Sequence, residues 1–400
     1  MNTSRTDTTS EEPILLEQTV STIRGILEEL HVPATLHEPL FEGNEWKYLK
    51  DCIDSGWVSS VGSYVDRIEQ MLAAYTGAGR AVAVVNGTAA LFIGLKLAGV
   101  EPGDEVLIPA LTFVATANAV TYCGATPHFV DSEDATLGMD PVKLGRYLNE
   151  IADSDNGETR NRLTGARIRA VIPMHTFGHP VDMDPLVELC SRWGLTIVED
   201  AAESLGSFYK GRHTGTFGRI GILSFNGNKT VTTGGGGALL LNDEAEARYA
   251  KHLTTTARRP HKWEFFHDML GYNFRMPNLN AALGCAQLER LPSFLERKRR
   301  LAERYAEAFK DSPGVRLMKE PPGSHSNYWL NALILNEAVA PQRDALLEAT
   351  NAGGIMTRPV WTLMHRLPMY ESCPRMDLSV AESLERRIVN IPSSVSRSGS

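Results

Sequence analysis

The sequence has no run of eighteen apolar residues, although 42% of its 400 residues are hydrophobic. Its first residues, MNTSRTDTTSEEP, lack the apolar core of a secretory signal. Basic residues are also scarce, because 40 Lys and Arg stand against 48 Asp and Glu and give a net charge of -8. Nucleic acids and anionic membrane surfaces are bound by basic faces. We therefore expect a cytoplasmic protein that binds neither nucleic acid nor membrane.

Cysteine is scarce as well. The five cysteines are odd in number, widely scattered and form no C-x-x-C pair, which disfavours a disulfide framework and a zinc cluster. His175 and His179 have a spacing seen in metal sites, but Gly178 and Pro180 disfavour a helix there. We expect a structural loop and no metal. The glycine run at 234–237 is no Walker loop, because no G-K-[ST] follows it.

Short apolar runs alternate with helical patterns along most of the chain. Strands that are apolar throughout and separated by helices are typical of a mostly parallel sheet covered on both faces. The sequence therefore predicts an α/β fold, with a large domain followed by a smaller one. Seven strands are expected, at residues 81–85, 105–109, 127–130, 168–173, 195–199, 220–225 and 238–241.

Changes in this pattern give the limits of the domains. Helical spacing predicts a first helix over residues 14–30 and a long one over 278–309, which leads out of the large domain. Residues 1–12 are polar enough for disorder, and the polar stretch 150–167 indicates an exposed connection. The expected units are an N-terminal extension with a helix at 1–40, a large domain at 41–295, a small C-terminal α/β domain at 296–392 and a flexible tail at 393–400.

Polar residues directly follow several of these strands, where ligands sit in open α/β sheets. Gly87 and Thr88 open a helix, whose free N–H groups suit a phosphate. Asp200 follows a buried strand, where a carboxylate needs a positive partner such as a protonated ring nitrogen. Lys229 comes in a tight turn after Ser224, and a partly desolvated lysine can attack an aldehyde. A helix cap, a salt bridge and a solvated lysine explain them singly, but their placement on one sheet favours a shared site.

Three further features extend this region. Glu203, expected one helical turn after Asp200, would face the same way. Phe113 lies at a strand-to-helix junction, where its ring either stacks on a flat cofactor or belongs to the core. The glycines at 234–237 let another part of the backbone approach closely.

Together these motifs resemble the nucleotide-sugar aminotransferases of the DegT/DnrJ/EryC1/StrS family, which are pyridoxal-phosphate enzymes of fold type I. The likeness spans roughly residues 40–392. Within the family the chain looks most like the LegC-type branch, which aminates the C4 keto group of a UDP- or GDP-linked 4-keto-6-deoxy-N-acetylhexosamine on the way to legionaminic acid or bacillosamine. The stretches that carry the likeness are GNEWKYLKDCIDSGWVSSVGSYV, TFVATANAV, SFNGNKTVTTGGGG, GYNFRMPNLNAALGCAQLERLPSF and SNYWLNA.

The resemblance implies roles for individual residues. Lys229 matches the lysine that bonds to pyridoxal 5'-phosphate, and Asp200 matches the acid that keeps the pyridine nitrogen protonated. Phe113 would cover one face of the ring, and Glu203 stands where many relatives have a Gln at the ring hydroxyl. Asn273 matches an asparagine that reaches the phosphate from the other subunit. The implied phosphate contacts are Gly87, Thr88, Ala89 and Ser224, and the implied substrate contacts are Asn228, Trp329 and Arg358.

The implied reaction moves the amino group of L-glutamate to a nucleotide-linked keto-sugar, in a homodimer with shared active sites. Two other interpretations stay open. One is an aminotransferase for another nucleotide keto-sugar, of perosamine type or with a 3-keto group. The other is a regulatory protein that kept the fold and the cofactor and lost turnover. A sugar dehydratase is disfavoured, because the resemblance ties that chemistry to a His at the position of Lys229.

Overall fold

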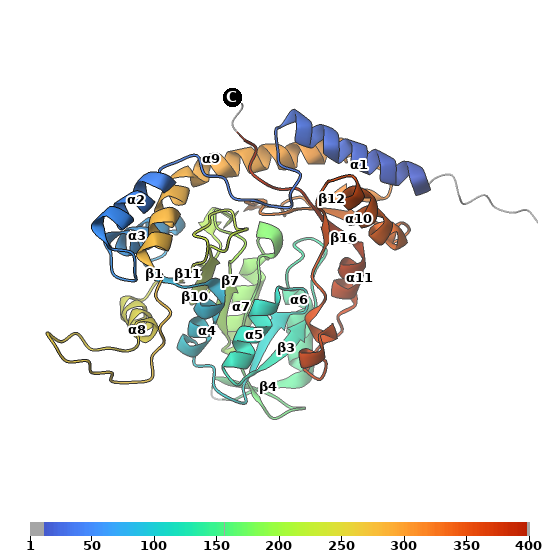
Figure 1. Ribbon diagram of the computed structural model, residues 1–400. Coiled ribbons are helices and arrows are strands. Elements are labelled where there is room, and N and C mark those ends of the chain that lie inside the picture. The colour runs from blue at the N-terminus through green and yellow to red at the C-terminus, as the bar shows by residue number, and fades with distance from the viewer. Residues whose placement is uncertain (1–11, 156, 398–400) are drawn as a thin grey trace, which may run out of the picture.

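The computed structural model describes residues 12–155 and 157–397. A nine-stranded sheet forms the centre of the large domain (Figure 1). Seven strands follow the order β1-β11-β10-β7-β6-β2-β3, and each lies at one of the seven expected runs. Their bounds are β1 Arg80–Val84, β2 Glu105–Pro109, β3 Thr126–Val130, β6 Arg167–Val171, β7 Thr196–Asp200, β10 Ile220–Ser224 and β11 Gly237–Leu241. The parallel neighbours are β10, β7, β6, β2 and β3, whereas β11 is antiparallel to both β1 and β10.

Helices cover both faces of this sheet. Leu239 and Leu241 pack with one helical layer, while Ala238 and Leu240 pack with the opposite one, because successive side chains of a strand alternate. Each buried aliphatic side chain of this size stabilises the fold by about 1.5–3 kcal/mol. The helices of the large domain are α2 Glu45–Ser55, α3 Ser63–Thr76, α4 Gly87–Leu97, α5 Val114–Tyr122, α6 Pro141–Ile151, α7 Met183–Trp193 and α8 Glu244–Thr254.

The prediction of an exposed connection at 150–167 is wrong. Residues Ala152–Asp155 (β4) and Glu158–Asn161 (β5) form a hairpin, and β5 pairs with β6 at the edge of the sheet. The inward side chains of β5 are polar, which hid the strand in the sequence. Thr159 donates to the Trp193 carbonyl (2.5 Å) and Asn161 donates to Glu105 (2.9 Å), so burial leaves neither group unpaired.

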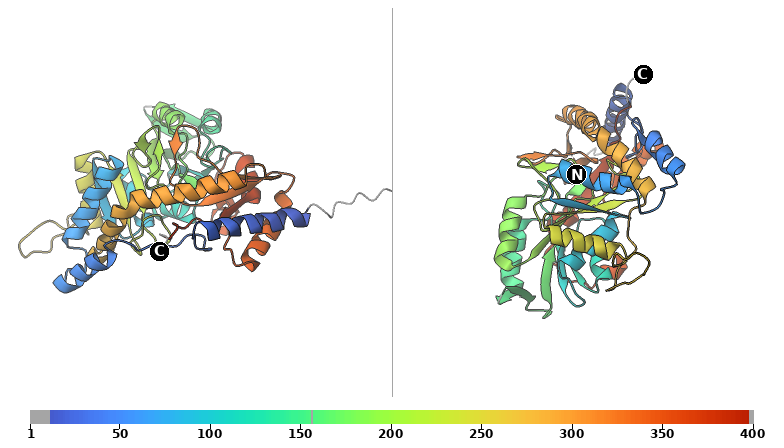
Figure 2. Two further views of the ribbon diagram at one scale, coloured as in Figure 1. Left: turned by 90° about the horizontal axis from the view of Figure 1, so that it is seen from above. Right: turned by 90° about the vertical axis from the view of Figure 1, so that its left-hand side faces the viewer.

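A smaller unit follows the 31-residue helix α9 (Asn278–Ala308), which runs without a break across the expected limit between residues 295 and 296. Figures 1 and 2 show α9 extending over both units, with α1 (Glu12–Glu29) alongside its second half. The remaining elements are β12 Val315–Leu317, β14 Asn331–Leu335, α10 Arg343–Ala352, β15 Arg358–Pro359, α11 Ser379–Arg387 and β16 Ile388–Ile391. The four strands form a sheet of order β12-β14-β16-β15, and a third sheet joins β13 (Ser324–His325) to β8 (Phe208–Tyr209) and β9 (Arg212–His213).

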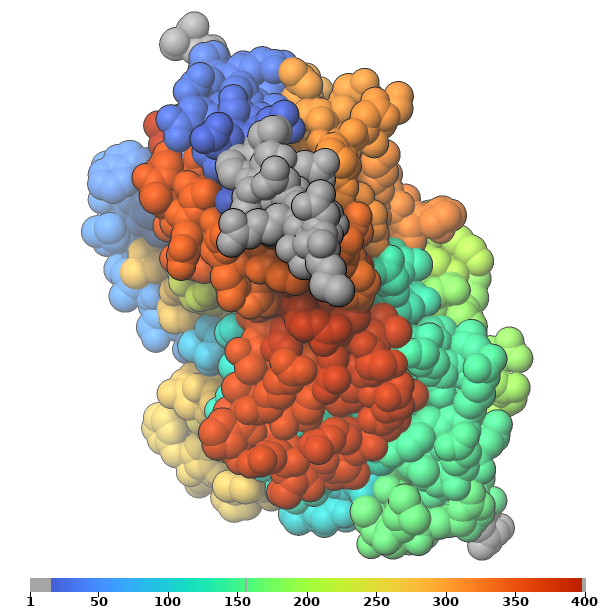
Figure 3. Space-filling view, turned by 90° about the vertical axis from the view of Figure 1, so that its right-hand side faces the viewer, coloured from blue at the N-terminus to red at the C-terminus, as the bar shows by residue number. Residues whose placement is uncertain are grey.

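The small unit is fastened to the large one through a buried carboxylate. Asp131, which follows β3, accepts a hydrogen bond from the backbone N–H of Ala381 in the first turn of α11 (2.8 Å). Lys143 of α6 pairs with the same carboxylate (2.6 Å). Figure 3 shows the C-terminal residues, in red, lying against the segments that follow α5. This contact fixes α11 at the edge of the central sheet, because a carboxylate at a helix N-terminus is favourable.

The beginning of the expected flexible tail is ordered instead. Ser393 and Ser394 are buried, and the hydroxyl of Ser393 accepts a hydrogen bond from the Asn331 backbone N–H (2.7 Å). Small polar residues indicated disorder by composition, whereas here their hydroxyls satisfy buried backbone groups. The disorder expected for residues 1–11 and 398–400 lies outside the described part of the chain. Among the described residues, no helix combines the length and the apolar character needed to cross a membrane.

Candidate active site

Lys229 lies in the turn that follows β10, where its backbone N–H donates to the Asn226 carbonyl (3.0 Å). Its amine is 3.3 Å from the Oε1 atom of Glu203 and 3.9 Å from the centre of the Trp329 ring. The side chain of Lys229 is only 14% exposed. The lysine therefore occupies a partly desolvated position between a carboxylate and an aromatic face, which is the setting that the sequence predicted for a nucleophilic amine.

Glu203 is held by its own surroundings. Its Oε2 atom accepts a hydrogen bond from the Phe177 backbone N–H (2.9 Å), and the residue is 4% exposed. Burial raises the pKa of Glu203 to about 7, although the positive charge of Lys229 acts in the opposite direction. The expected helical turn after Asp200 is absent, since residues 201–206 form turns. Glu203 still faces Lys229, because the chain reverses at the end of β7.

Asp200 ends β7 and is 3% exposed. One carboxylate oxygen accepts a hydrogen bond from the Thr116 hydroxyl (2.7 Å), and the other accepts one from the Ala202 N–H (3.2 Å). Burial raises the pKa of Asp200, while these hydrogen bonds and the charge of Lys229 act to lower it. A buried carboxylate that is incompletely compensated favours a cation beside it, such as a protonated pyridine nitrogen.

The phosphate cradle predicted at the start of α4 is tightly packed. A Cβ atom on Gly87 would lie 2.9 Å from the Cβ of Ser224, so only glycine lets the start of α4 meet the end of β10. A Cβ on Gly237 would lie 2.6 Å from the backbone carbon of Asn86, which is the close backbone approach expected of the glycine run. Asn86 caps α4 by accepting a hydrogen bond from the Ala89 N–H (2.8 Å). Ala89 therefore already has a partner, whereas Thr88 stands at the open end of the helix.

Two of the remaining predicted residues join the site. The indole N–H of Trp329 donates to the backbone carbonyl of Asn228 (2.7 Å), which places both beside Lys229. Phe113 is 49% exposed and approaches Trp361 at 6.2 Å, edge to face, so its ring does not belong to the core. The ring of Phe113 is therefore available to stack on a flat ligand.

Arg358 and Asn273 make their hydrogen bonds elsewhere. Arg358 is exposed in β15 and donates to the Thr357 carbonyl (3.0 Å). Asn273 is exposed on the segment between α8 and α9, and its side-chain oxygen accepts a hydrogen bond from Arg275 (2.9 Å). Their roles stay predictions, since a substrate or a second subunit would have to bring them to Lys229.

Sequence reasoning missed several residues at this site. Thr116 is visible in TFVATAN, but nothing in the chain linked it to Asp200, which is 84 positions away. Lys298 of α9 is 1% exposed and donates to the carbonyls of Trp329 (3.2 Å) and Ser393 (2.5 Å). Burial lowers the pKa of Lys298 to about 7. Lys298 lies among other charged residues of α9, so the sequence did not indicate that it is buried.

His175 and His179 form part of the same neighbourhood. A carboxylate lies near His175, because Glu199 is 3.1 Å from its Nε2 atom. The other ring nitrogen of His175 accepts a hydrogen bond from the Val181 N–H (3.2 Å). His179 shares a hydrogen bond with Ser326 (2.9 Å), and burial lowers its pKa to about 4. Within the described ranges, no group of three potential ligands is arranged for a metal ion.

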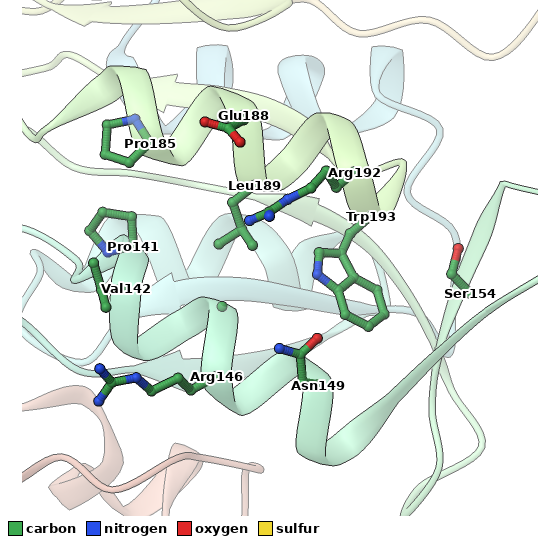
Figure 4. A pocket seen from close by; sticks show the side chains of 11 residues that line it. Pro141, Val142, Arg146, Asn149, Ser154, Pro185, Glu188, Leu189, Arg192 and Trp193 are labelled. Carbon is green, nitrogen blue, oxygen red and sulfur yellow. The ribbon is translucent and has the colours of Figure 1, made fainter.

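A surface groove between α6 and α7 is a separate feature (Figure 4). Leu189, Arg192 and Trp193 of α7 extend toward α6 in this groove. Its lining contains none of the predicted site residues. The candidate active site is therefore the region around Lys229, at the carboxyl ends of the strands.

The residues around Lys229 fit pyridoxal phosphate. An amine, a buried carboxylate, an exposed phenyl ring and a glycine-lined helix start match its aldehyde, ring nitrogen, ring face and phosphate in turn. Asp200 ends β7 and Lys229 follows β10, and these strands are parallel neighbours, so both residues lie at the same edge of the sheet. Gly87 and Gly237 allow the start of α4 to pack closely against β10 and β11 at the end where a phosphate would lie.

Comparisons with known proteins identify the family of the chain. Residues 40–399 match the model of the DegT/DnrJ/EryC1/StrS aminotransferase family. The chain is 38% identical to the putative pyridoxal phosphate-dependent aminotransferase EpsN of Bacillus subtilis, over 91% of this chain and 92% of that protein. It is 36% identical to GDP-perosamine synthase of Vibrio cholerae, over 90% and 93%. The crystal structure of the aminotransferase TlmJ from Streptoalloteichus hindustanus superposes with a TM-score of 0.82 at 30% identity, covering 91% of this chain and 94% of that one.

The match extends over both structural units, so it concerns the whole fold rather than the cofactor region alone. The chain belongs to the DegT/DnrJ/EryC1/StrS aminotransferase family and is a pyridoxal-phosphate-dependent nucleotide-sugar aminotransferase of fold type I.

Proposed function

We propose that this enzyme transfers the amino group of L-glutamate to the C4 keto group of a UDP- or GDP-linked 4-keto-6-deoxy-N-acetylhexosamine, in the synthesis of sugars of the legionaminic acid or bacillosamine type. The observation that carries the transfer is the partly desolvated amine of Lys229, 3.3 Å from Glu203 and electrostatically coupled to the buried Asp200. The choice of sugar rests on the likeness of the five stretches named in the sequence analysis to the LegC-type branch.

Pyridoxal phosphate, when bound, supplies an electron sink for the negative charge that develops at the substrate carbon. Lys229 holds the cofactor in the resting enzyme. Asp200, fixed by Thr116, keeps the pyridine nitrogen protonated. Gly87, Thr88 and Ser224 line the phosphate end.

The lysine also moves the proton. With the cofactor bound, the amine of Lys229 would take up and return the proton of the substrate carbon that carries the amino group. Glu203 lies within reach of that amine and stabilises its charged form. Trp329 offers its ring face to the same ammonium at 3.9 Å. L-Glutamate leaves as 2-oxoglutarate, and the keto-sugar takes the amino group by the reverse steps.

A second candidate substrate is a GDP-linked 4-keto-6-deoxyhexose without the N-acetyl group. Its support is the similarity to three GDP-perosamine synthases, which are 36–37% identical over 88–90% of this chain. The same residues would serve either sugar, because they act on the amino group and the cofactor. The two candidates differ only in the contacts to the sugar.

We further propose a homodimer with shared active sites. The arm, defined as residues 256–276 between α8 and α9, projects from the large domain (Figure 1). It exposes large apolar side chains, among them Trp263 (70%), Phe265 (76%) and Leu270 (80%). Apolar groups so exposed favour a protein partner. A second copy fits, because Asn273 on the same arm would then reach the phosphate end of the partner's site.

The test supplies ¹⁵N-labelled L-glutamate and a panel of UDP- and GDP-linked 4-keto-6-deoxy sugars, with and without an N-acetyl group. Mass spectrometry should detect a labelled aminosugar from the N-acetylated substrate, together with 2-oxoglutarate. K229A should form no product and lose the absorbance of the lysine-bound cofactor. K210A, which alters an exposed loop lysine, should behave as the wild type. Full activity in K229A would refute the proposal.

A further inference from the structure

A histidine lies beside Lys229 that no motif pointed to. His37 belongs to the strap, defined as residues 31–44, which connects α1 to α2. Its imidazole is subject to the charges of Lys229 and Lys298 and to the backbone carbonyl of Asn228. That carbonyl also accepts the indole N–H of Trp329. Lys298 donates to the carbonyls of both Trp329 and Ser393, and the Ser393 N–H donates to the Leu36 carbonyl, so the strap lies on the Trp329 side of the site.

The strap is fastened on both sides of His37. The Leu36 carbonyl accepts a hydrogen bond from the Ser393 N–H (2.8 Å), and the Glu38 N–H donates to the Ser394 hydroxyl (2.9 Å). Ser393 in turn holds Lys298 through its own carbonyl (2.5 Å). Backbone hydrogen bonds at the residues before and after His37 fix the backbone that carries its side chain. The direction of the imidazole is thereby restricted.

Both ring nitrogens of His37 are buried, and neither makes a well-aligned hydrogen bond among the described residues, although the Asn228 carbonyl lies near enough to raise the pKa of the imidazole. A buried polar group without a partner costs about 1–3 kcal/mol. Such groups are rare and mark a place where a partner is supplied from outside the chain. The chain thus retains a costly pair of unpaired atoms beside its reactive lysine.

The imidazole is uncharged. Burial, first, and then the positive charges of Lys298 and Lys229 hold the pKa of His37 well below its usual range, while the Asn228 carbonyl acts in the opposite direction. A neutral imidazole has one N–H donor and one acceptor nitrogen. Carboxylates and phosphates offer acceptors alone, so they would leave the acceptor nitrogen unpaired. A hydroxyl or an amide offers both functions.

We infer that His37 is a specificity-determining residue whose imidazole donates a hydrogen bond to, and accepts one from, hydroxyl or amide groups of the keto-sugar. This inference rests on the proposed function. L-Glutamate, an acid with two carboxylates, is not its partner.

The test compares H37L, H37N and the matched variant H31N, which alters an exposed histidine of the same strap. The probes are UDP-4-keto-6-deoxy-N-acetylglucosamine and GDP-4-keto-6-deoxymannose. In H37L, KM for the sugar that the wild type aminates should rise about tenfold, the effect of a lost hydrogen bond. The absorbance change on adding L-glutamate alone should keep its wild-type rate. H37N, which retains a donor and an acceptor, should recover most of the affinity, and H31N should change nothing.

Thermal unfolding gives a readout that does not depend on turnover. Because H37L removes two unpaired buried nitrogens, its melting temperature should equal or exceed that of the wild type. An unchanged KM for the sugar in H37L would overturn the inference, and so would an equal defect in the glutamate step, which would show a structural role. A wild-type enzyme that aminates neither probe would instead overturn the proposed function.

Discussion

The amine of Lys229 lies 3.3 Å from Oε1 of Glu203, and the Phe177 N–H fixes the other oxygen of that carboxylate. Many relatives are expected to carry an uncharged Gln at this position. In this enzyme the reactive amine therefore has a neighbour that can itself gain and lose a proton near neutral pH.

Changing Glu203 to Gln should alter how stability depends on pH. Burial raises the folded-state pKa of Glu203 to about 7, well above that of an unfolded Glu. The stability that its protonated form contributes is present below the unfolded pKa and is lost as pH rises through about 7. E203Q lacks this loss, so its stability relative to the wild type should increase between pH 5 and pH 8. Urea unfolding of the cofactor-free proteins at both pH values measures it.

This experiment has a control variant, and the charged neighbours of Glu203 stay unchanged in it. E264Q, at a Glu whose side chain is 68% exposed, should track the wild type at every pH. Lys229 and Asp200 are the charged groups that act on Glu203, and neither is altered by the substitution. A constant difference between E203Q and the wild type from pH 5 to pH 8 would show that Glu203 does not titrate there.

Substitutions of Asp200 and of Thr116 should lower kcat by different amounts. D200N removes the charge that keeps the cofactor ring protonated, so kcat should fall by about 10²- to 10⁴-fold. T116V removes only the 2.7 Å hydrogen bond to that carboxylate, and kcat should fall about tenfold. Steady-state kinetics at saturating glutamate and keto-sugar give both values. Equal losses in the two variants would mean that Thr116 acts by some other route.

Because Gly87 packs against Ser224, substitution of Gly87 should cause a steric clash, and a second substitution at Ser224 should relieve it. G87A would bring its Cβ to 2.9 Å from the Cβ of Ser224 and should destabilise the fold by about 1–3 kcal/mol. G87A/S224G removes the opposing atom and should regain part of the stability. It should still bind pyridoxal phosphate weakly, because the Ser224 hydroxyl is lost. Thermal unfolding and cofactor titration separate the two effects, with S224G alone as the control.

The arm predicts the oligomeric state. F265S/L270S should shift the protein from dimer to monomer, because it removes two of the most exposed apolar side chains of the arm. L163S, at a Leu that is 81% exposed on another surface, should leave the dimer intact. Sedimentation equilibrium measures both. A wild-type protein that stays monomeric and active at micromolar concentration is incompatible with shared sites.

Shared sites also predict complementation between two defective chains. K229A and N273A should each be impaired alone. In a mixed dimer, the Lys229 of one chain and the Asn273 of the other form one intact site. Mixing the two proteins after mild unfolding should therefore give more activity than the sum of the separate samples. Activity that never exceeds this sum would place both residues in the same subunit's site.

The sequence by itself determined the large domain closely. All seven expected strands are present, and the helix expected over 278–309 is α9, because these elements depend on the local spacing of apolar residues. The turn that holds Lys229 and the close approach at Gly237 also followed from local chemistry. The hairpin at 152–161 did not, since its inward residues are polar and their partners, such as Glu105, are distant in the chain.

Only the tertiary structure decided which polar groups share the site. Thr116 meets Asp200, Trp329 meets Lys229, and His37 comes to the same place through a strap tied down by Ser393 and Ser394. A chain encodes such meetings in contacts between distant segments, which neither periodicity nor composition reveals. Burial also depends on distant segments of the chain. A Glu or Lys at the surface would keep an ordinary pKa. Desolvation by the surrounding fold moves the pKa of Glu203 and of Lys298 to about 7.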